Sequence, residues 1–224
     1  MSARVPVGGA AADFLVAADS AVVLLGGVEV VQRWSDPSAL PGMTVGALAA
    51  HLGSQVLHVH AAVTAGTGVA DGRPVTLLEH YARVPWVEAG FDDASNVAIR
   101  EGAEHSAAIG HDALVLSVQQ AVDDLRTAFT RNLPSGLPPA IRMAHWDWSV
   151  SFEDFLVTRV MEIVVHSDDL AVSVDVAPPR LPDPVLGPVL ALLVGISLRR
   201  HGQAALVRTL SRSERAPRSV SAFE

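Results

Sequence analysis

Four residues capable of acid–base or metal chemistry lie in one line within an otherwise apolar segment. In VTRVMEIVVHSDDLAV (157–172), Arg159, Glu162, His166 and Asp169 follow 3-4-3 spacing. On an α-helix this spacing brings all four side chains to one face. A surface helix usually carries a broad polar face, whereas this segment is mostly Val, Leu, Ile and Met. It is therefore predicted to be buried on most sides, with its polar line facing an internal site or a narrow window of solvent.

A second apolar segment carries a similar polar line. In VGALAAHLGSQVLHVHAAV (45–63), His51, Gln55 and His58 are separated by four and three residues, and most of the remainder is apolar or small. Two such helices in one bundle can direct their polar lines at each other. A buried carboxylate without a partner is costly, and pairing or metal coordination is the usual resolution. The two segments are therefore predicted to face each other.

The chemistry that these lines suggest is a metal site. Glu162 and His166 are one helical turn apart and could both reach one divalent cation, with His51 as a third ligand from the other helix. Three such ligands leave a position for water or substrate, as in catalytic zinc sites, and the ligand types favour zinc. Spacing alone is not specific, because Glu101 and His105 have the same spacing among polar and small residues, where a solvated face is expected.

The remaining residues of the two lines have alternative interpretations. Asp169, one turn beyond His166, could be an outer partner of that ligand or a proton acceptor. Arg159 could neutralise a substrate carboxylate or hold Glu162. Both could instead pair with charges on neighbouring helices. His58 could be a pocket residue or a fourth ligand, but a hydrogen-bonded core histidine is the favoured interpretation.

Outside the two lines the signals are weaker. Trp146 and Trp148 could line a hydrophobic cleft or pack over the bundle. Five further histidines suggest no constellation: His60, His80, His111, His145 and His201.

Stretches rich in Pro and Gly divide the chain into long segments with helical periodicity. We predict an all-α fold, an up-and-down four-helix bundle with additional C-terminal helices. The whole chain, 1–224, is expected to form one domain, with a helical extension from about 176. Thr44 and Ser151 are predicted N-caps. A small strand within 140–148 could pair with the tail at 219–223. The predicted helices are at 9–33, 44–64, 92–131 with a break at Gly110, 151–174, 184–201 and 203–211.

Composition narrows the classes of function. The 224 residues carry 24 acidic and 16 basic groups, and no basic stripe that would suit nucleic acid. All the basic residues are arginine, a bias typical of a GC-rich genome such as that of an actinobacterium. With no cysteine, a metal must be held by His, Asp or Glu, and thiol chemistry needs a thiol from outside the chain.

The sequence has two long apolar runs, and neither has the features of a secretory signal peptide or of a membrane-spanning helix. Acidic residues at Asp13, Asp19 and Glu29 interrupt the N-terminal run, which argues against a secretory signal. The run Val185–Leu198 contains Pro188 and falls short of the ~20 residues that cross a bilayer. A cytoplasmic protein with no membrane partner is expected.

Two blocks of sequence resemble a known family. LPGMTVGALAAHL (40–52) and SFEDFLVTRVMEIVVHSDDLAVSV (151–174) are similar to the metal-binding domain of mycothiol-dependent maleylpyruvate isomerases, in the DinB-like superfamily. Carried over position by position, the family's ligands fall on His51, Glu162 and His166. Met43 stands where the family usually has tryptophan. The chain is also too short for the additional C-terminal domain with which the archetypal isomerase completes its thiol-binding cleft, so maleylpyruvate is not assumed as substrate.

The resemblance implies an enzyme that uses a divalent metal, expected to be Zn²⁺, to activate mycothiol for attack on an electrophile. An isomerase would release the thiol again, and an S-transferase would leave it attached. Two other functions stay open: a non-catalytic sensor that binds metal or thiol, and a bundle whose polar lines form only internal salt bridges. The sequence names neither the electrophile nor the oligomeric state.

Overall fold

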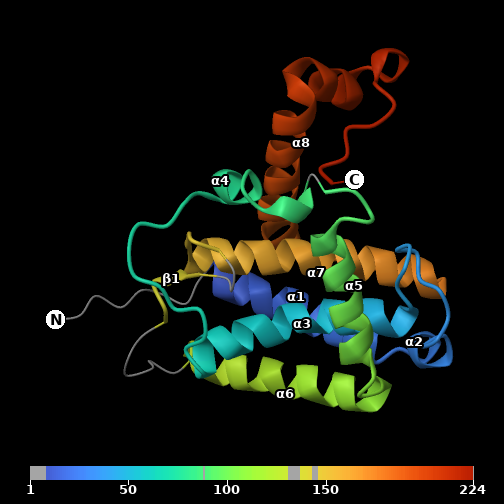
Figure 1. The fold of residues 1–224 in the computed structure, drawn as a ribbon, viewed down its shortest axis with the longest axis vertical. Coiled ribbons are helices and arrows are strands. Elements are labelled where there is room, and N and C mark those ends of the chain that lie inside the picture. Colours follow the sequence, from blue (N-terminus) through green and yellow to red (C-terminus); the bar gives the residue numbers. More distant parts are fainter. Residues whose placement is uncertain (1–8, 88, 131–136, 143–145, 224) are drawn as a thin grey trace.

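The chain folds mainly into α-helices, as predicted (Figure 1). The computed structural model describes residues 9–87, 89–130, 137–142 and 146–223. Two short 3-10 helices, η1 (Pro85–Val87) and η2 (Ser213–Arg215), accompany the α-helices. The α-helices are α1 (Ala10–Leu25), α2 (Val28–Gln32), α3 (Val45–Thr64), α4 (Leu77–Tyr81), α5 (Ala94–Ala107), α6 (His111–Thr130), α7 (Phe152–Val174) and α8 (Asp183–Ser211).

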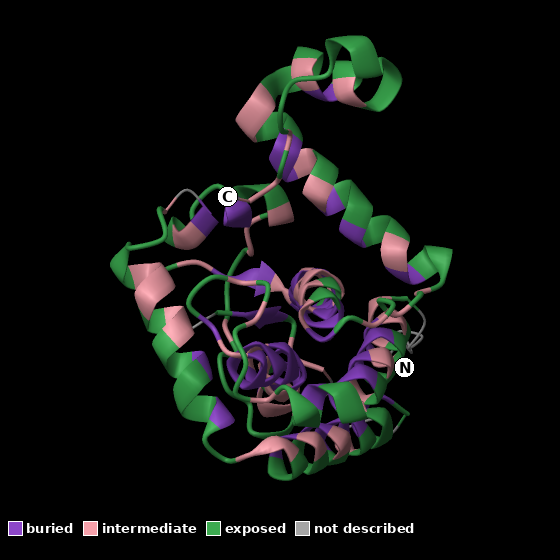
Figure 2. Ribbon diagram, turned by 90° about the vertical axis from the view of Figure 1, so that its right-hand side faces the viewer, coloured by how far each residue is buried: buried purple, intermediate pink, exposed green. Residues whose placement is uncertain are grey.

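Helices α1, α3, α6 and α7 form the bundle that holds the main core. Figure 2 shows their buried surfaces turned toward one another. Contacts fix the directions: His60 of α3 meets Asp124 of α6, and Gly53 lies beside Val118, so α3 and α6 run parallel. Helix α1 runs antiparallel to α6, because Asp19 meets Arg126 and Leu25 meets His111. Contacts described below make α7 antiparallel to α3, so the chain reverses direction between α1 and α3 and again between α6 and α7. Between α3 and α6, however, residues 65–110, including α5, carry it back along the bundle.

Glycines mark where the predicted helices break. The segment predicted as one helix at 9–33 is two helices, because Gly26 and Gly27 separate α1 from α2. The predicted break at Gly110 is confirmed, with a φ of 86° that favours glycine. At Gly202 a φ of 80° interrupts α8, at the point between the two helices predicted there.

Both predicted N-caps are confirmed. The side chains of Thr44 and Ser151 each accept a hydrogen bond of 3.0 Å from the backbone N–H three residues on, so they begin α3 and α7. Helix α4 was not predicted, because its five residues are too few for a periodic pattern. A reciprocal capping box between Thr76 and Glu79 begins it.

The small strand pair forms, but with a different partner. β1 (Ala140–Ile141) pairs antiparallel with β2 (Val150–Ser151), directly before α7. The predicted pairing with the tail at 219–223 is therefore wrong. The tail folds back along α8 because its carbonyl groups accept hydrogen bonds from that helix. The donors are Ser197 to Val220, Arg200 to Ala222 and His201 to Ser221.

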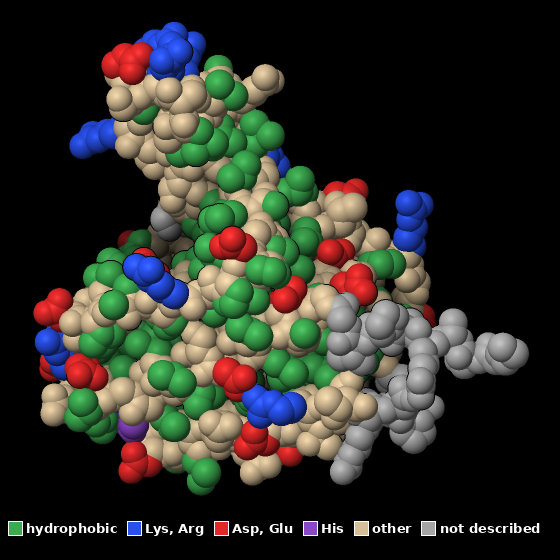
Figure 3. Space-filling model, turned by 180° about the vertical axis from the view of Figure 1, so that it is seen from behind, with side chains coloured by type: hydrophobic (Ala, Val, Ile, Leu, Met, Phe, Trp, Pro, Cys, Tyr) green, Lys and Arg blue, Asp and Glu red, His purple; other side chains and the backbone are tan. Residues whose placement is uncertain are grey.

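Helix α8 leaves the bundle as a projection (Figures 1 and 2). One face packs on the body through Val185, Val189, Leu192 and Ile196, and other apolar side chains such as Leu190 stay exposed. Figure 3 shows basic side chains gathered at the tip, beyond a partly hydrophobic stem. By length and composition alone α8 could span a membrane, although helices of soluble proteins meet the same criterion. The run Val185–Leu198 is only part of this longer helix.

Two glycine substitutions test the packing of α3. A Cβ at Gly46 would lie 2.6 Å from the indole of Trp34, whereas one at Gly102 in α5 would meet nothing within 4 Å. Gly46→Ala should lower the free energy of unfolding by about 1–3 kcal/mol, because the ring must move. Gly102→Ala should raise it by about 0.5–1 kcal/mol through helix propensity. Urea unfolding measures both, and shifts of the same sign would contradict this packing.

Candidate metal centre

The two polar lines meet where α3 packs against α7, as predicted. The ring centroids of His51 and His166 lie 4.6 Å apart in an edge-to-face arrangement. One turn away, the side-chain oxygen of Gln55 accepts a 2.7 Å hydrogen bond from Nη1 of Arg159. Because α3 and α7 run antiparallel, successive residues of one line face successive residues of the other.

His51, Glu162 and His166 form a compact donor group. Each offers a ligand atom, and these atoms all lie within 4.8 Å of one another; no other group of this kind occurs among the described residues. Zinc bonds of ~2.0–2.1 Å in a tetrahedron put ligand atoms roughly 3.4 Å apart, so small side-chain rotations would close the site. The side chains of His166 and Glu162 are only 14% and 12% exposed. Two imidazoles and one carboxylate in this setting fit a zinc-like ion.

Carboxylates face both ring nitrogens of His166. Nε2 lies 3.1 Å from Oε2 of Glu162, and Nδ1 lies 3.0 Å from Oδ2 of Asp169. Burial alone would lower the pKa of His166. The hydrogen bonds to Asp169 and Glu162 outweigh this effect, so the pKa of His166 is raised. Burial would raise the pKa of Glu162, yet the hydrogen bond from His166 and nearby positive charges hold it below its ordinary value. The three groups therefore form a hydrogen-bonded chain along α7.

His51 has the opposite electrostatics. Burial, followed by the positive charges of His166 and Arg159, lowers its pKa to about 4, although Glu162 acts against this. Its imidazole is therefore neutral at neutral pH, which is the form that binds metal ions. The site thus presents one neutral imidazole from α3 to an ion pair on α7.

Arg159 is buried and its hydrogen bonds go to neutral groups. Nε donates to Oγ1 of Thr158 at 3.1 Å, and Nη1 donates to Gln55. Its guanidinium carbon lies 5.5 Å from the centre of the Phe155 ring. Within the described residues it makes no direct contact with a carboxylate, so the predicted alternatives of holding Glu162 or pairing with a neighbouring helix are not observed. Asp169, by contrast, pairs with His166 on its own helix.

His80 lies near the centre, although no sequence pattern predicted this. Nε1 of Trp148 donates a 3.1 Å hydrogen bond to Nδ1 of His80, and the Trp146 ring lies 4.8 Å from the His80 ring. The two indoles stack on each other at 5.1 Å and remain partly exposed. Burial, then the charge of Arg159, lowers the pKa of His80 to about 4, with Glu162 opposing, which places His80 within electrostatic reach of the centre. No periodic pattern links α4 to this loop.

The remaining histidines lie outside the donor group. His58 is exposed and has no hydrogen-bond partner among the described residues, so the favoured prediction of a hydrogen-bonded core histidine is wrong. Glu101 and His105 are exposed on α5, as predicted. His145 lies outside the described residues. His60, His111 and His201 make hydrogen bonds to Asp124, to Asp112 and the Leu25 carbonyl, and to the Ser221 carbonyl, respectively.

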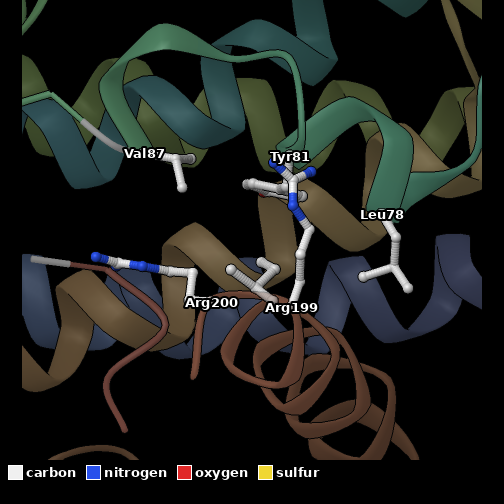
Figure 4. Close-up of a pocket in the computed structure, with 6 residues that line it drawn as sticks. Leu78, Tyr81, Val87, Arg199 and Arg200 are labelled. Atoms are coloured by element: carbon white, nitrogen blue, oxygen red, sulfur yellow. The ribbon is translucent and has the colours of Figure 1, made fainter. Parts of the chain in front are cut away.

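A separate small cavity lies between α4 and α8. Figure 4 shows Arg199 reaching from α8 toward Tyr81 of α4. The cavity has about 10 Å³ of free space, no more than a water molecule needs. The hydroxyl of Tyr81 is buried without a hydrogen-bond partner, and burial raises its pKa. This cavity is too small for a substrate.

Comparison with known proteins agrees with the geometry. Residues 16–171 match the family described as the mycothiol maleylpyruvate isomerase N-terminal domain. This range includes α3 and nearly all of α7, and therefore His51, Glu162 and His166. No curated protein and no solved structure gives a match. Because the family match covers well over half of the chain, the chain belongs to the mycothiol maleylpyruvate isomerase N-terminal domain family, a DinB-like family.

Proposed function

We propose that the protein is a metal-dependent enzyme that activates a low-molecular-weight thiol, mycothiol, for addition to an electrophile. The observation that carries the proposal is the convergence of His51, Glu162 and His166 in a chain of this family. The ligand types favour Zn²⁺. The reaction is of the isomerase or S-transferase type, and both begin with addition of the thiolate. We place it in the cytoplasm, where thiols are kept reduced.

The residues of the site have distinct roles in this proposal. His51, Glu162 and His166 would hold the ion, leaving a position for the thiol. A bound divalent ion lowers the pKa of a coordinated thiol, which is ordinarily near ~8.5, and so supplies thiolate at neutral pH. Asp169 is a positioning residue: it holds a proton on Nδ1 of His166, so that Nε2 faces the shared donor position.

A sensor that binds metal or thiol without turnover is the second candidate. The same three ligands would serve both functions. Turnover therefore separates the two candidates, whereas metal content does not.

Metal content tests the centre itself. The purified protein should contain about one zinc-like ion per chain, and His51→Ala or His166→Ala should lose it, because two ligands do not hold such an ion tightly. His105→Ala is the matched control, since His105 follows Glu101 at the same spacing on an exposed face. Elemental analysis by mass spectrometry gives the stoichiometry. Metal-free protein after gentle purification, or equal metal in all variants, would refute the centre.

Proton release tests the charge state of the ligands. Around pH 7, zinc added to chelator-treated protein should displace about one proton, because His166 is protonated between two carboxylates while His51 is already neutral and Glu162 already ionised. Zinc affinity should rise with pH until the raised pKa of His166 is passed. The release should fall in Asp169→Asn, which removes a group that raises that pKa. Calorimetry in buffers of different ionisation enthalpy measures it, and buffer-independent heats would contradict the assignment.

Turnover tests the reaction. Zinc-loaded protein is incubated with mycothiol and a panel of electrophiles, and the products are weighed by mass spectrometry. An unchanged mass with new double-bond geometry identifies an isomerase, and an adduct mass identifies a transferase. Asp169→Asn should slow the reaction about 10–100-fold, and His105→Ala should not. Fully loaded protein that converts nothing would favour the sensor.

A further inference from the structure

Arg159 is a buried cation without a counter-ion in contact. Its residue is 8% exposed, yet no carboxylate of the described residues lies within 4.0 Å of its guanidinium nitrogens. Burial of an unpaired charge costs several kcal/mol even after relaxation, by order of magnitude. Such a group normally has a partner, and an anion is the partner that a guanidinium fits best.

The hydrogen bonds of Arg159 leave one edge of the guanidinium free. Of its five N–H groups, Nε–H is directed at Thr158 and one Nη1–H at Gln55. Among the described residues Nη2 has no hydrogen-bond partner, and it is not one of the sealed unpartnered side-chain atoms there, which are Tyr81 Oη and Ser167 Oγ. Nη2 is therefore not sealed from solvent, and together with the second N–H of Nη1 it can donate two parallel hydrogen bonds to a carboxylate.

Neutral groups also lie near Arg159. Gln55 of α3 accepts a hydrogen bond from it, and His80 of α4 is close enough for the charge of Arg159 to lower its pKa, after burial. Trp148 donates to Nδ1 of His80, so the proton of the neutral ring is on Nε2 and can serve as a further donor.

Glu162 does not supply the missing counter-charge. Its carboxylate lies one turn along α7 and is already hydrogen bonded to His166, and it would be a ligand of the ion in the loaded protein. Arg159 and Glu162 interact only through space. Arg159 therefore lies beside the metal centre, within one helical turn of a ligand.

We propose that Arg159 forms an anion subsite next to the metal centre, and that this subsite binds a carboxylate group of the electrophile. The inference rests on the proposed function and narrows it: the substrates are electrophilic carboxylic acids, and neutral electrophiles of the same shape are poor substrates. Gln55 and Thr158 are positioning residues that hold the guanidinium by two of its edges. A purely structural role in joining α3 to α7 is the alternative, but a neutral pair would do this without the cost of burying a charge.

The test uses an isosteric pair of small probes in the absence of thiol. Crotonate and crotonamide have the same planar shape and differ in charge. Ligand-observed NMR measures their affinity for the full chain, both zinc-loaded and chelator-treated. Crotonate should bind at least about tenfold more tightly than crotonamide to both forms, because hydrogen bonds to charged groups contribute roughly 1.5–3 kcal/mol. Equal affinities would overturn the subsite. A preference found only in the zinc-loaded form would also overturn it, because the ion would then be the anchor.

Two variants of Arg159 locate the effect. Arg159→Gln should abolish the preference with unchanged metal content, and Arg159→Lys should keep part of it, because lysine retains the charge without the fork. Arg126→Gln is the matched control: it removes an arginine charge from an exposed pair with Asp19 and Asp123. A preference that persists in Arg159→Gln, or loss of metal in that variant, would overturn the proposal and assign Arg159 to the support of Glu162.

A second measurement covers the case in which Arg159→Gln does not fold. In the wild-type chain, the guanidinium resonances that are missing from Arg159→Lys should shift when crotonate is added and stay fixed with crotonamide. Fixed resonances with both probes would overturn the proposal. Because no thiol is present, these results are independent of turnover. Inactive protein that still prefers crotonate refutes only the proposed function, and active protein without the preference refutes only the subsite.

Discussion

The contact between α3 and α7 determines whether this protein has a site at all. Both helices are apolar over most of their surface, and each carries a single line of polar side chains. When such helices pack antiparallel at that line, imidazole, carboxylate, amide and guanidinium groups meet in surroundings from which most water is excluded. The low polarity strengthens every hydrogen bond within the line and makes any unpaired group costly. Other elements act by keeping this contact in register, including the N-caps at Thr44 and Ser151 and the strand pair before α7.

Within the contact, environment gives similar residues different charge states. His51 and His166 face each other, yet burial keeps the first neutral while two carboxylates keep the second charged. The contact therefore contains a neutral imidazole that can bind a metal ion, an ion pair between His166 and Glu162, and the guanidinium of Arg159. This division of roles comes from the distribution of hydrogen bonds. In the described part of the chain, the carboxylate of Asp169 hydrogen bonds to His166 on its own helix, and Gln55 accepts from Arg159 across the interface.

The parts that could be predicted are those in which local periodicity determines the geometry. The spacing of Arg159, Glu162, His166 and Asp169 on one long helix fixes their common face. The apolar background required a partner for that face, so the meeting with His51 followed. His80 and Trp148 could not be predicted together, because a five-residue helix and an irregular loop approach each other only through the fold. The parallel direction of α3 and α6 could not be predicted for a similar reason, because it depends on the path of residues 65–110.

The return of the tail along α8 determines where the described chain finishes. The ring of Phe223 lies 5.3 Å from that of Trp86 and 6.1 Å from that of Tyr81, so residue 223 is anchored beside α4 and η1 instead of at the tip of the projection. Any polypeptide fused after this point would emerge against the body of the molecule, on the side that carries His80. An affinity tag fused there would lie beside α4 and crowd the approach to this helix.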